Sequence, residues 1–261
     1  MKVYIVTDME GISGVNREEM VNQGAGEWYA QGRRLMMADI NAAIRGAFDG
    51  GATEVLVCDG HGGAPHLILE DMDERAEYAR PGDPILYGLD SSYDAMFLIG
   101  THAMAGTPEA FLDHTQSSLA WYNYFVNGRK FGEIGQEAMV GGHFGVPLIL
   151  ATGDHAACAE AHDLLGDDIA TVEVKSAIGR QWARCLHPRV AQEAIQSGAA
   201  QAMKLVGKAK PFKIDLPATV RLELYRTDMA DGYAGSHRVR RVGPREIEFT
   251  AETQAEILSF S

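Results

Sequence analysis

The stretch "KVYIVTDMEGISG" (residues 2–14) decides how the rest of the chain is interpreted. Residues 2–7 form a mostly apolar run of strand length, and two carboxylates, Asp8 and Glu10, follow it directly. A continuous apolar run is typical of a strand that is buried on both faces of a parallel sheet. In open sheets of this kind, ligands bind at the carboxyl ends of the strands. The stretch therefore predicts a buried strand whose carboxyl end lies where a ligand can bind.

Apolar runs of similar length recur along the chain, and longer amphipathic segments separate them. Two of these segments, residues 27–51 and 187–207, have apolar residues at helical spacing, with a Gly pair at the end of the first and Pro188 near the start of the second. Alternating strands and helices predict βαβ units around a mostly parallel sheet. The expected strands occupy residues 2–7, 53–58, 79–89, 95–100, 146–152 and 170–174.

Two regions depart from this alternation. In "AWYNYFVNGRKFGE" (residues 120–133) an Asn-Gly pair separates two β-prone arms, which predicts an inserted β-hairpin. The tail from Pro217 onward is β-rich, and no Ser- or Pro-rich linker precedes it. We therefore expect an α/β fold with a mostly parallel sheet, flanking helices, the inserted hairpin and a smaller β-rich α+β C-terminal portion. Residues 1–210 would form the main region, and residues 211–261 would share its core.

Composition narrows the possible partners and the compartment. The chain has 261 residues, with 23 Lys and Arg against 36 Asp and Glu, a net charge of −13 that argues against nucleic acid or an anionic membrane as partner. Its three cysteines, Cys58, Cys158 and Cys185, show no CxxC spacing, which argues against a disulfide framework. Neither a signal peptide nor a membrane span is evident. We expect a soluble cytoplasmic protein that acts on a small molecule or a peptide.

Asp8 and Glu10 pose an electrostatic problem. Side chains two residues apart on an extended strand point to the same side, so these two carboxylates can face one another. Two buried like charges both stay ionised only if a positive group lies between them, and a metal ion meets that need. Alternatively, Asp8 caps the following turn and Glu10 is solvated. This stretch by itself does not choose between the two interpretations.

The next expected strands favour the metal. His61, in "TEVLVCDGHGG" (residues 53–63), follows one strand, and His102, in "AMFLIGTHAMAG" (residues 95–106), follows another. The carboxyl ends of neighbouring parallel strands line one crevice, so these side chains and the two acids are expected to meet. A single histidine after a strand is more often a structural hydrogen-bonding group, but three strands with the same feature are harder to explain in that way.

Glu133 in "GEIGQEAMVGG" (residues 132–142) is a fifth candidate ligand, at the expected start of a helix, where an acid is also favourable for the helix dipole. A mixture of carboxylates and imidazoles suits zinc or a similar divalent ion. Three carboxylates and two histidines exceed what a single tetrahedral ion needs. The count therefore predicts two metal ions that share a carboxylate.

With these motifs in place, the sequence resembles the zinc-dependent D-aminopeptidases encoded with bacterial dipeptide-transport genes. The resemblance covers most of the chain. It is carried by "DMEGISG" (residues 8–14), "DGHGG" (59–63), "GTHAMAGTP" (100–108), "DHT" (113–115), "GEIGQEAMVGG" (132–142), "ATGDHAA" (151–157), "VKSAIGR" (174–180) and "ARCLHP" (183–188).

The resemblance implies a site, an activity and an assembly. By similarity, the five ligands of a dinuclear zinc centre are Asp8, Glu10, His61, His102 and Glu133, with Asp8 as the bridging carboxylate and His114 as the catalytic residue. The implied activity is hydrolysis of short peptides or aminoacyl amides with D-amino-acid N-termini, by a water activated at the zinc pair. Members of this family form ring-shaped homo-oligomers, so the resemblance implies a homo-oligomer here, such as a decameric ring. His114 could transfer a proton, act as a nucleophile or stabilise an oxyanion. Asp59 could orient the ring of His61 or cap a turn.

Two other functions remain open at this point. "DMEGI" (residues 8–12) resembles the Asp-x-Asp signature of magnesium-dependent aspartyl-phosphate phosphatases, for which Asp8 would be the nucleophile and the acids of "GDD" (residues 166–168) a later acidic pair. That interpretation has Glu10 in place of the second Asp and assigns no role to His61 or His102. The other alternative is a non-catalytic metal-binding protein linked to peptide transport.

Overall fold

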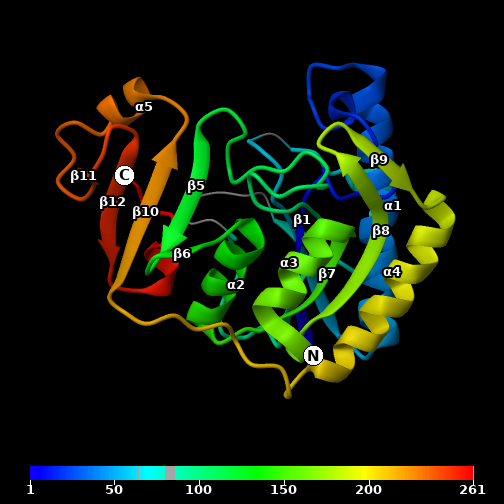
Figure 1. Cartoon of the computed structure of the whole chain (residues 1–261). Helices are drawn as coiled ribbons and strands as arrows, with labels where there is room; N and C mark the ends of the chain where they lie inside the picture. Colours follow the sequence, from blue (N-terminus) through cyan, green and yellow to red (C-terminus); the bar gives the residue numbers. More distant parts are fainter. Residues whose placement is uncertain (64, 80–85, 261) are drawn as a thin grey trace.

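A seven-stranded sheet forms the centre of the computed structural model, which describes residues 1–63, 65–79 and 86–260 (Figure 1). Its strands are β1 (Lys2–Thr7), β2 (Glu54–Asp59), β3 (Glu77–Ala79), β4 (Ala95–Thr101), β7 (Leu148–Asp154), β8 (Ala170–Gly179) and β9 (Trp182–Cys185). They lie in the order β3-β2-β1-β4-β7-β8-β9. The pairs are parallel except β8 with β9, which is antiparallel. β1 is therefore an inner strand, with β2 and β4 as its neighbours.

Helices cover both faces of this sheet. The helices are α1 (Glu27–Asp49), α2 (Glu133–Phe144), α3 (His155–Leu165), α4 (Pro188–Ala202) and the short α5 (Thr227–Asp231), and 3-10 turns lie at Glu18–Met20, Leu69–Asp71, Gly166–Asp168, Met203–Leu205 and Gln254–Glu256. Val3 and Ile5 of β1 pack into the core under α1 and α4, whereas Tyr4 and Val6 pack into the core that contains α2 and α3. This alternation follows from the two-residue period of a strand and explains why β1 is apolar throughout.

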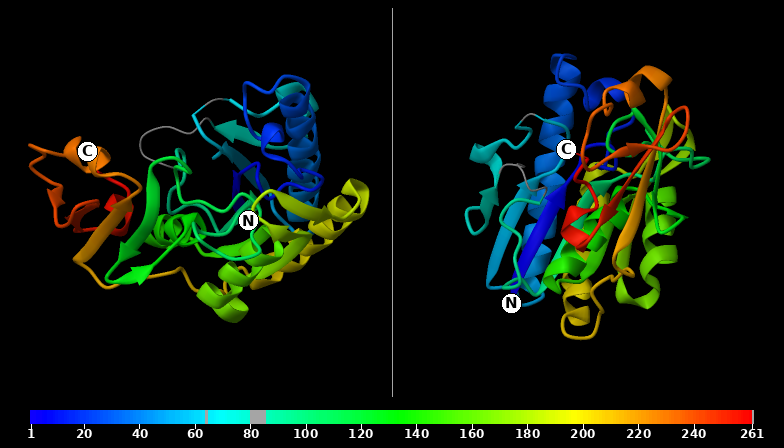
Figure 2. Two further views of the ribbon diagram at one scale, coloured as in Figure 1. Left: turned by 45° about the horizontal axis from the view of Figure 1, so that its top comes forward. Right: turned by 90° about the vertical axis from the view of Figure 1, so that its left-hand side faces the viewer.

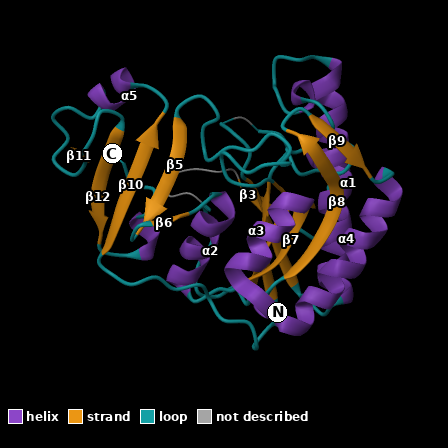
Figure 3. Cartoon of the chain, viewed as in Figure 1, coloured by secondary structure: helices purple, strands orange, loops and turns teal. Residues whose placement is uncertain are grey.

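A second, five-stranded sheet lies on the α2 side of the molecule (Figure 3). It has the order β11-β12-β10-β5-β6 and consists of β5 (Trp121–Val126), β6 (Arg129–Lys130), β10 (Ala218–Leu224), β11 (Arg240–Arg241) and β12 (Glu246–Ala251). The β5–β6 hairpin turns at Asn127 and Gly128, both with positive φ, as the Asn-Gly pair predicts. β5 also pairs antiparallel with β10. The inserted hairpin and the C-terminal tail therefore form one sheet.

Helix α2 lies between the two sheets. Ile134 and Ala138 of this helix share a core with Tyr124 of β5 and Leu222 of β10. Figure 2 shows the C-terminal strands, in orange and red, on the side of the molecule opposite α1 and α4. The start of α2 is therefore packed between the central sheet and a second sheet made from distant parts of the chain.

The fold class expected from the sequence is confirmed. The two long helices and the strands that start near residues 2, 53, 95, 146 and 170 lie where they were expected, within a few residues. The expectation of a strand at 79–89 falls partly outside the described residues; β3 ends at Ala79, and residues 86–89 form a turn. The hairpin does not stand free, because Tyr124 and Val126 are buried against β10.

None of the helices in the described residues has both the length and the apolar character needed to cross a bilayer.

Candidate metal centre

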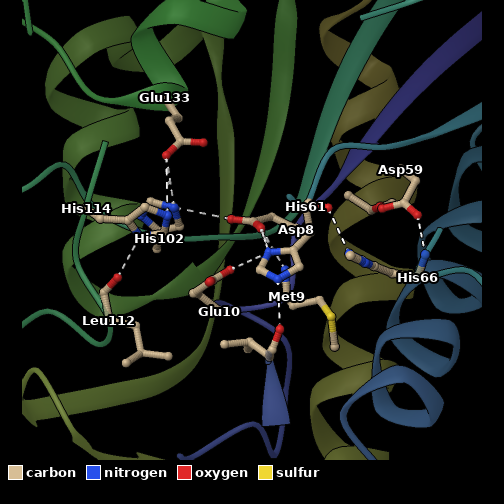
Figure 4. A network of polar contacts seen from close by, with 12 residues as sticks. Asp8, Met9, Glu10, Asp59, His61, His66, His102, Leu112, His114 and Glu133 are labelled. Carbon is tan, nitrogen blue, oxygen red and sulfur yellow. Dashed lines mark hydrogen bonds and ion pairs between the residues drawn. The ribbon is translucent and has the colours of Figure 1, made fainter. Parts of the chain in front are cut away.

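Six side chains converge at the carboxyl ends of β2, β1 and β4 (Figure 4). Asp8 and Glu10 follow β1, His61 follows β2, and His102 follows β4, while Glu133 is the first residue of α2. The sixth, His114, lies in the loop between β4 and β5. Neighbouring parallel strands deliver polar residues to one edge, as the sequence pattern indicated.

The two acids after β1 converge by a route that differs from the one expected. Residues 8–14 form turns rather than a continued strand, so the alternation of an extended chain does not align Asp8 with Glu10. Instead, the Asp8 and Gly11 amides donate to the carbonyls of Ile99 and Gly100 at the end of β4. A Cβ atom on Gly11 would collide with the carbonyl oxygen of Thr101, so this close approach requires glycine.

Asp8, Glu10 and His61 form the first of two triads, which we call triad A. His61 Nδ1 lies 2.9 Å from Asp8 Oδ1 and 3.1 Å from Glu10 Oε2. The other ring nitrogen, His61 Nε2, lies 3.0 Å from the carbonyl oxygen of Val21. The imidazole is therefore anchored on the backbone and faces two carboxylates.

His102, His114 and Glu133 form the second triad, triad B. Glu133 Oε1 lies 3.3 Å from His102 Nε2 and 3.8 Å from His114 Nε2. The two imidazole rings stack with their centroids 3.9 Å apart. Asp8 joins the triads, because its second oxygen, Oδ2, lies 3.4 Å from His102 Nε2 while Oδ1 faces His61.

The hydrogen bonds of the three imidazoles fix which nitrogen carries a proton. His102 Nδ1 lies 3.0 Å from the carbonyl of Ala103, and His114 Nδ1 lies 2.9 Å from that of Leu112. A carbonyl oxygen only accepts, so these nitrogens, and Nε2 of His61, must be the N–H donors. In the neutral rings the remaining nitrogens then present lone pairs to carboxylates. This arrangement is the one that metal-ligating histidines adopt.

The cluster requires positive charge. Burial alone would lower the pKa of His61, but the carboxylates of Glu10 and Asp8 outweigh it and hold that pKa well above its ordinary value. The same balance holds for His102, whose burial is outweighed by Glu133 and Asp8, so its pKa is also raised well above the usual range. The three carboxylates therefore draw positive charge into the cluster, and protonated imidazoles or bound metal ions can supply it.

The donor set fits divalent metal ions. Buried Glu10 Oε2 makes no hydrogen bond within the described residues, although His61 Nδ1 lies 3.1 Å away. Tetrahedral zinc with bonds of ~2.0–2.1 Å separates its ligand atoms by ~3.3–3.4 Å. The contacts from His102 Nε2 to Glu133 and to Asp8, 3.3 and 3.4 Å, have this spacing. Mixed nitrogen and oxygen donors favour zinc over magnesium or calcium.

Sequence reasoning overlooked Glu137, one helical turn after Glu133. Its half-buried carboxyl lines a cavity of about 10 Å³ together with Asp8 and Glu133. Burial and then the charges of Glu133 and Asp8 raise the pKa of Glu137 well above its ordinary value. The four-residue spacing on one helix face was the available signal for this residue.

Gln116 was also overlooked, and the orienting role considered for Asp59 is not seen. The Gln116 amide donates to Glu133 Oε1 at 2.6 Å, which fixes that carboxylate, and no sequence motif signals this contact. Asp59 Oδ2 accepts from the backbone amide of His66 at 2.6 Å and does not contact the ring of His61. Asp59 therefore caps the turn that follows β2, the other possibility left open by the sequence.

Comparisons with known proteins place this site in context. The sequence profile of the family Peptidase_M55, described as D-aminopeptidase, matches residues 1–261. A D-aminopeptidase of Bacillus subtilis (strain 168) is 34% identical over 216 residues, 81% of this chain and 77% of that protein. The solved structure of the "Zn-dependent D-aminopeptidase DppA from Bacillus subtilis, a self-compartmentalizing protease" superposes with a TM-score of 0.94 at 29% identity, covering 100% of this chain and 95% of the other.

Proposed function

Because the chain belongs to the Peptidase_M55 family of D-aminopeptidases, we propose that it is a zinc-dependent aminopeptidase that removes D-amino acids from short peptides and amides. The observation that carries this proposal is the position of Asp8. One oxygen of this carboxylate faces His61 in triad A, and the other faces His102 in triad B. A carboxylate shared by two ligand sets is the arrangement expected of a two-metal hydrolase.

The proposed ligands divide between the two triads. Asp8, Glu10 and His61 would hold one zinc ion, and Asp8, His102 and Glu133 would hold the second. A bound zinc pair supplies a water that is acidic near neutral pH and a Lewis acid for a carbonyl oxygen. The backbone carbonyls of Val21 and Ala103 keep His61 and His102 in the tautomers that such ligation needs.

His114 is proposed to act on the substrate. Its Nδ1–H is fixed on the carbonyl of Leu112, so Nε2 is the atom available to accept and return a proton. Its Nε2 lies 3.8 Å from Glu133 Oε1, farther than His102 Nε2, which lies 3.3 Å from the same oxygen. The same nitrogen could attack the scissile carbonyl or donate to an oxyanion once it is protonated, and a fixed ring serves each of these roles.

The two alternatives from the sequence are set aside. Family membership assigns the chain to peptidases rather than to phosphatases. Asp8, the nucleophile of the phosphatase interpretation, is engaged with two imidazoles. The acids of "GDD" lie in the turn Gly166–Asp168, between the end of α3 and the start of β8. They are therefore at the amino end of a strand, whereas the candidate site lies at the carboxyl ends of the strands. A purely non-catalytic metal protein is disfavoured by the same family match.

A substrate panel combined with metal analysis tests the function. Purified protein should contain two zinc ions per chain and hydrolyse D-alanyl p-nitroanilide and D-dipeptides faster than their L-counterparts. The metal-free protein should be inactive and should recover on addition of zinc. Hydrolysis of phosphate monoesters without any amide hydrolysis, or a clear preference for L-substrates, would contradict the proposal.

We also propose that the chain forms a homo-oligomer larger than a dimer, since the matched solved structure is called self-compartmentalizing. The β8–β9 hairpin exposes Ile178 and Trp182, at 76% and 70%, and such large apolar side chains are typical of buried contacts between subunits. Light scattering should show the oligomer, and Ile178→Asp should reduce its size while Leu69→Asp, another exposed apolar position, should not. A wild-type monomer at micromolar concentration would contradict the assembly but not the activity.

The proposed compartment is the cytoplasm. Cys58, Cys158 and Cys185 are all free thiols, which is the state that a reducing compartment maintains.

A further inference from the structure

Lys175 in β8 is a buried lysine, 2% exposed, with no place in the chemistry described above. Its Nζ donates to the carbonyl of Glu10 at 2.7 Å and to that of Val15 at 2.6 Å. These two carbonyls mark the beginning and the end of residues 10–15, the turn that starts with Glu10 of triad A. One ammonium group therefore closes this turn against the central sheet.

The same ammonium group also contacts the loop that carries His114. Nζ of Lys175 lies 4.8 Å from the centroid of the Phe111 ring, a cation–π contact. Neighbouring bonds hold this loop to the end of the sheet: Asp154 Oδ2 accepts from the Phe111 amide at 2.7 Å, and the carbonyl of Arg180 accepts from the Leu112 amide at 2.9 Å. Lys175 thus lies between the turn of Glu10 and the loop of His114.

The cost of this arrangement argues for a specific role. Burying an ammonium group is unfavourable unless it is well bonded, and an apolar residue of similar volume often stabilises a core more. Lys175 directs its donors to two carbonyls of the turn at residues 10–15 and its charge to the aromatic ring of Phe111, so it ties two separate segments to β8. Apolar packing cannot fix carbonyl positions in this way.

We propose that Lys175 is a positioning residue for the peptidase reaction, one that sets the position of the Glu10 turn relative to the His114 loop. This inference rests on the proposed function for its kinetic part. The geometric part, that Lys175 orders residues 8–15, concerns the chain alone.

The first experiment compares Lys175→Met with Lys213→Met. Lys213 is the matched control, because its Nζ also donates to a backbone carbonyl, that of Gly142 near the far end of α2 from Glu133. Loss of a group that orients metal ligands typically lowers activity by ~10- to 100-fold, so kcat of Lys175→Met should fall by that factor with KM little changed. Lys213→Met should keep the wild-type kcat.

A second readout uses metal-free protein and needs no substrate. Hydrogen exchange of the amides in residues 8–15 should accelerate in Lys175→Met, whereas the amides of β10 should exchange at the wild-type rate. Lys175→Arg, which keeps the charge and the donors, should restore part of kcat and of the protection. If the wild type proves inactive on D-substrates, the proposed function fails, and this exchange measurement still decides the role of Lys175.

Phe111→Leu covers the case in which Lys175→Met does not fold. This variant keeps both carbonyl bonds of Lys175 but removes the ring, so it should lower kcat while exchange in residues 8–15 stays normal. The proposal is overturned by wild-type kcat and wild-type exchange in Lys175→Met, by an equal loss in Lys213→Met, or by wild-type kcat in Phe111→Leu.

Discussion

Triad A and triad B are built in different ways. Asp8, Glu10 and His61 follow β1 and β2, adjacent strands whose residues pair in register from Lys2 with Glu54 to Thr7 with Asp59. His102, His114 and Glu133 come from a strand end, a long loop and the start of a helix. The central sheet by itself brings the residues of triad A together, whereas those of triad B meet only when distant segments pack against one another. The two halves of one site can therefore respond differently to the same kind of change.

Asp8 belongs to both triads, so a change at this residue should affect both halves of the site. Asp8→Ala removes the shared carboxylate, so zinc content should fall by at least one ion per chain and the melting temperature should drop. Turnover should fall by more than the ~10²- to 10⁴-fold expected for loss of a single proton-transfer group. Elemental analysis, thermal unfolding and amide hydrolysis measure these effects.

The control for that variant is Asp167→Ala, which removes an exposed acid beyond the end of α3. It should leave zinc, stability and turnover unchanged. An Asp8→Ala protein that retained two zinc ions would remove the basis for the shared carboxylate.

His114→Ala sharpens the comparison inside triad B. If His114 acts on the substrate, the variant should keep two zinc ions and the wild-type melting temperature while kcat falls by ~10²- to 10⁴-fold. His162→Ala, which removes an exposed histidine of α3, is the control and should be fully active. Loss of one zinc ion from His114→Ala would instead make His114 a ligand, and full activity would mean that the catalytic histidine lies elsewhere.

Asp39 gives triad A a pH-dependent support. Its carboxylate accepts from the Ser13 amide and hydroxyl, and burial raises its pKa from 3.8 to about 6. Between about pH 4 and pH 6 the native state binds more protons at Asp39 than the unfolded state does. The free energy of unfolding therefore loses roughly 3 kcal/mol through Asp39 as the pH rises from 4 to 6. Below pH 4 and above pH 6, Asp39 adds no further pH dependence.

Asp39→Asn should remove this dependence, because the amide does not titrate. Denaturant unfolding of the metal-free proteins at pH 4, 5, 6 and 7 would give the difference between wild type and variant. Parallel curves for the two proteins across this range would show that Asp39 does not titrate as described.

Tyr124→Phe probes the long-range support of triad B and should have the smallest effect. The buried hydroxyl of Tyr124 in β5 donates to the carbonyl of Ile257 at 2.7 Å. Its loss should reduce the free energy of unfolding by about 1 kcal/mol. Because the five-stranded sheet supports α2, hydrogen exchange should accelerate around Glu133 but not in residues 8–15. Faster exchange in residues 8–15 would mean that the two halves are not supported separately.

The contrast between the halves also explains what could be predicted from the sequence. β1 and the positions of Asp8, His61 and His102 were visible because apolar runs end in polar residues, a local pattern. The pairing of β5 with β10 could not be predicted, since partners such as Leu222 and Tyr124 lie far apart in the chain. The alternation of apolar and polar residues shows which face of a strand is buried but not which strand lies next to it. The ligand assignments stay predictions, although the structure brings all five residues and His114 into contact range.

Lys175 marks the limit of sequence reasoning. Its motif, "VKSAIGR" (residues 174–180), was noted only as part of a resemblance. Its polar partners are backbone carbonyls about 160 residues away, and backbone carbonyls have no sequence signature. Gln116 was missed for a related reason, because its backbone amide, and not its side chain, makes the contact with Glu133. Side chains that act through the main chain are found only once the fold is known.

The central claim, two zinc ions that share Asp8, is tested most directly by anomalous diffraction from crystals of the zinc-loaded protein, measured on both sides of the zinc absorption edge. We expect two peaks per chain, one within bonding distance of Asp8, Glu10 and His61 and the other within bonding distance of Asp8, His102 and Glu133. A single octahedral ion on Asp8 and Glu10, with His61 and His102 turned away from it, would contradict the claim.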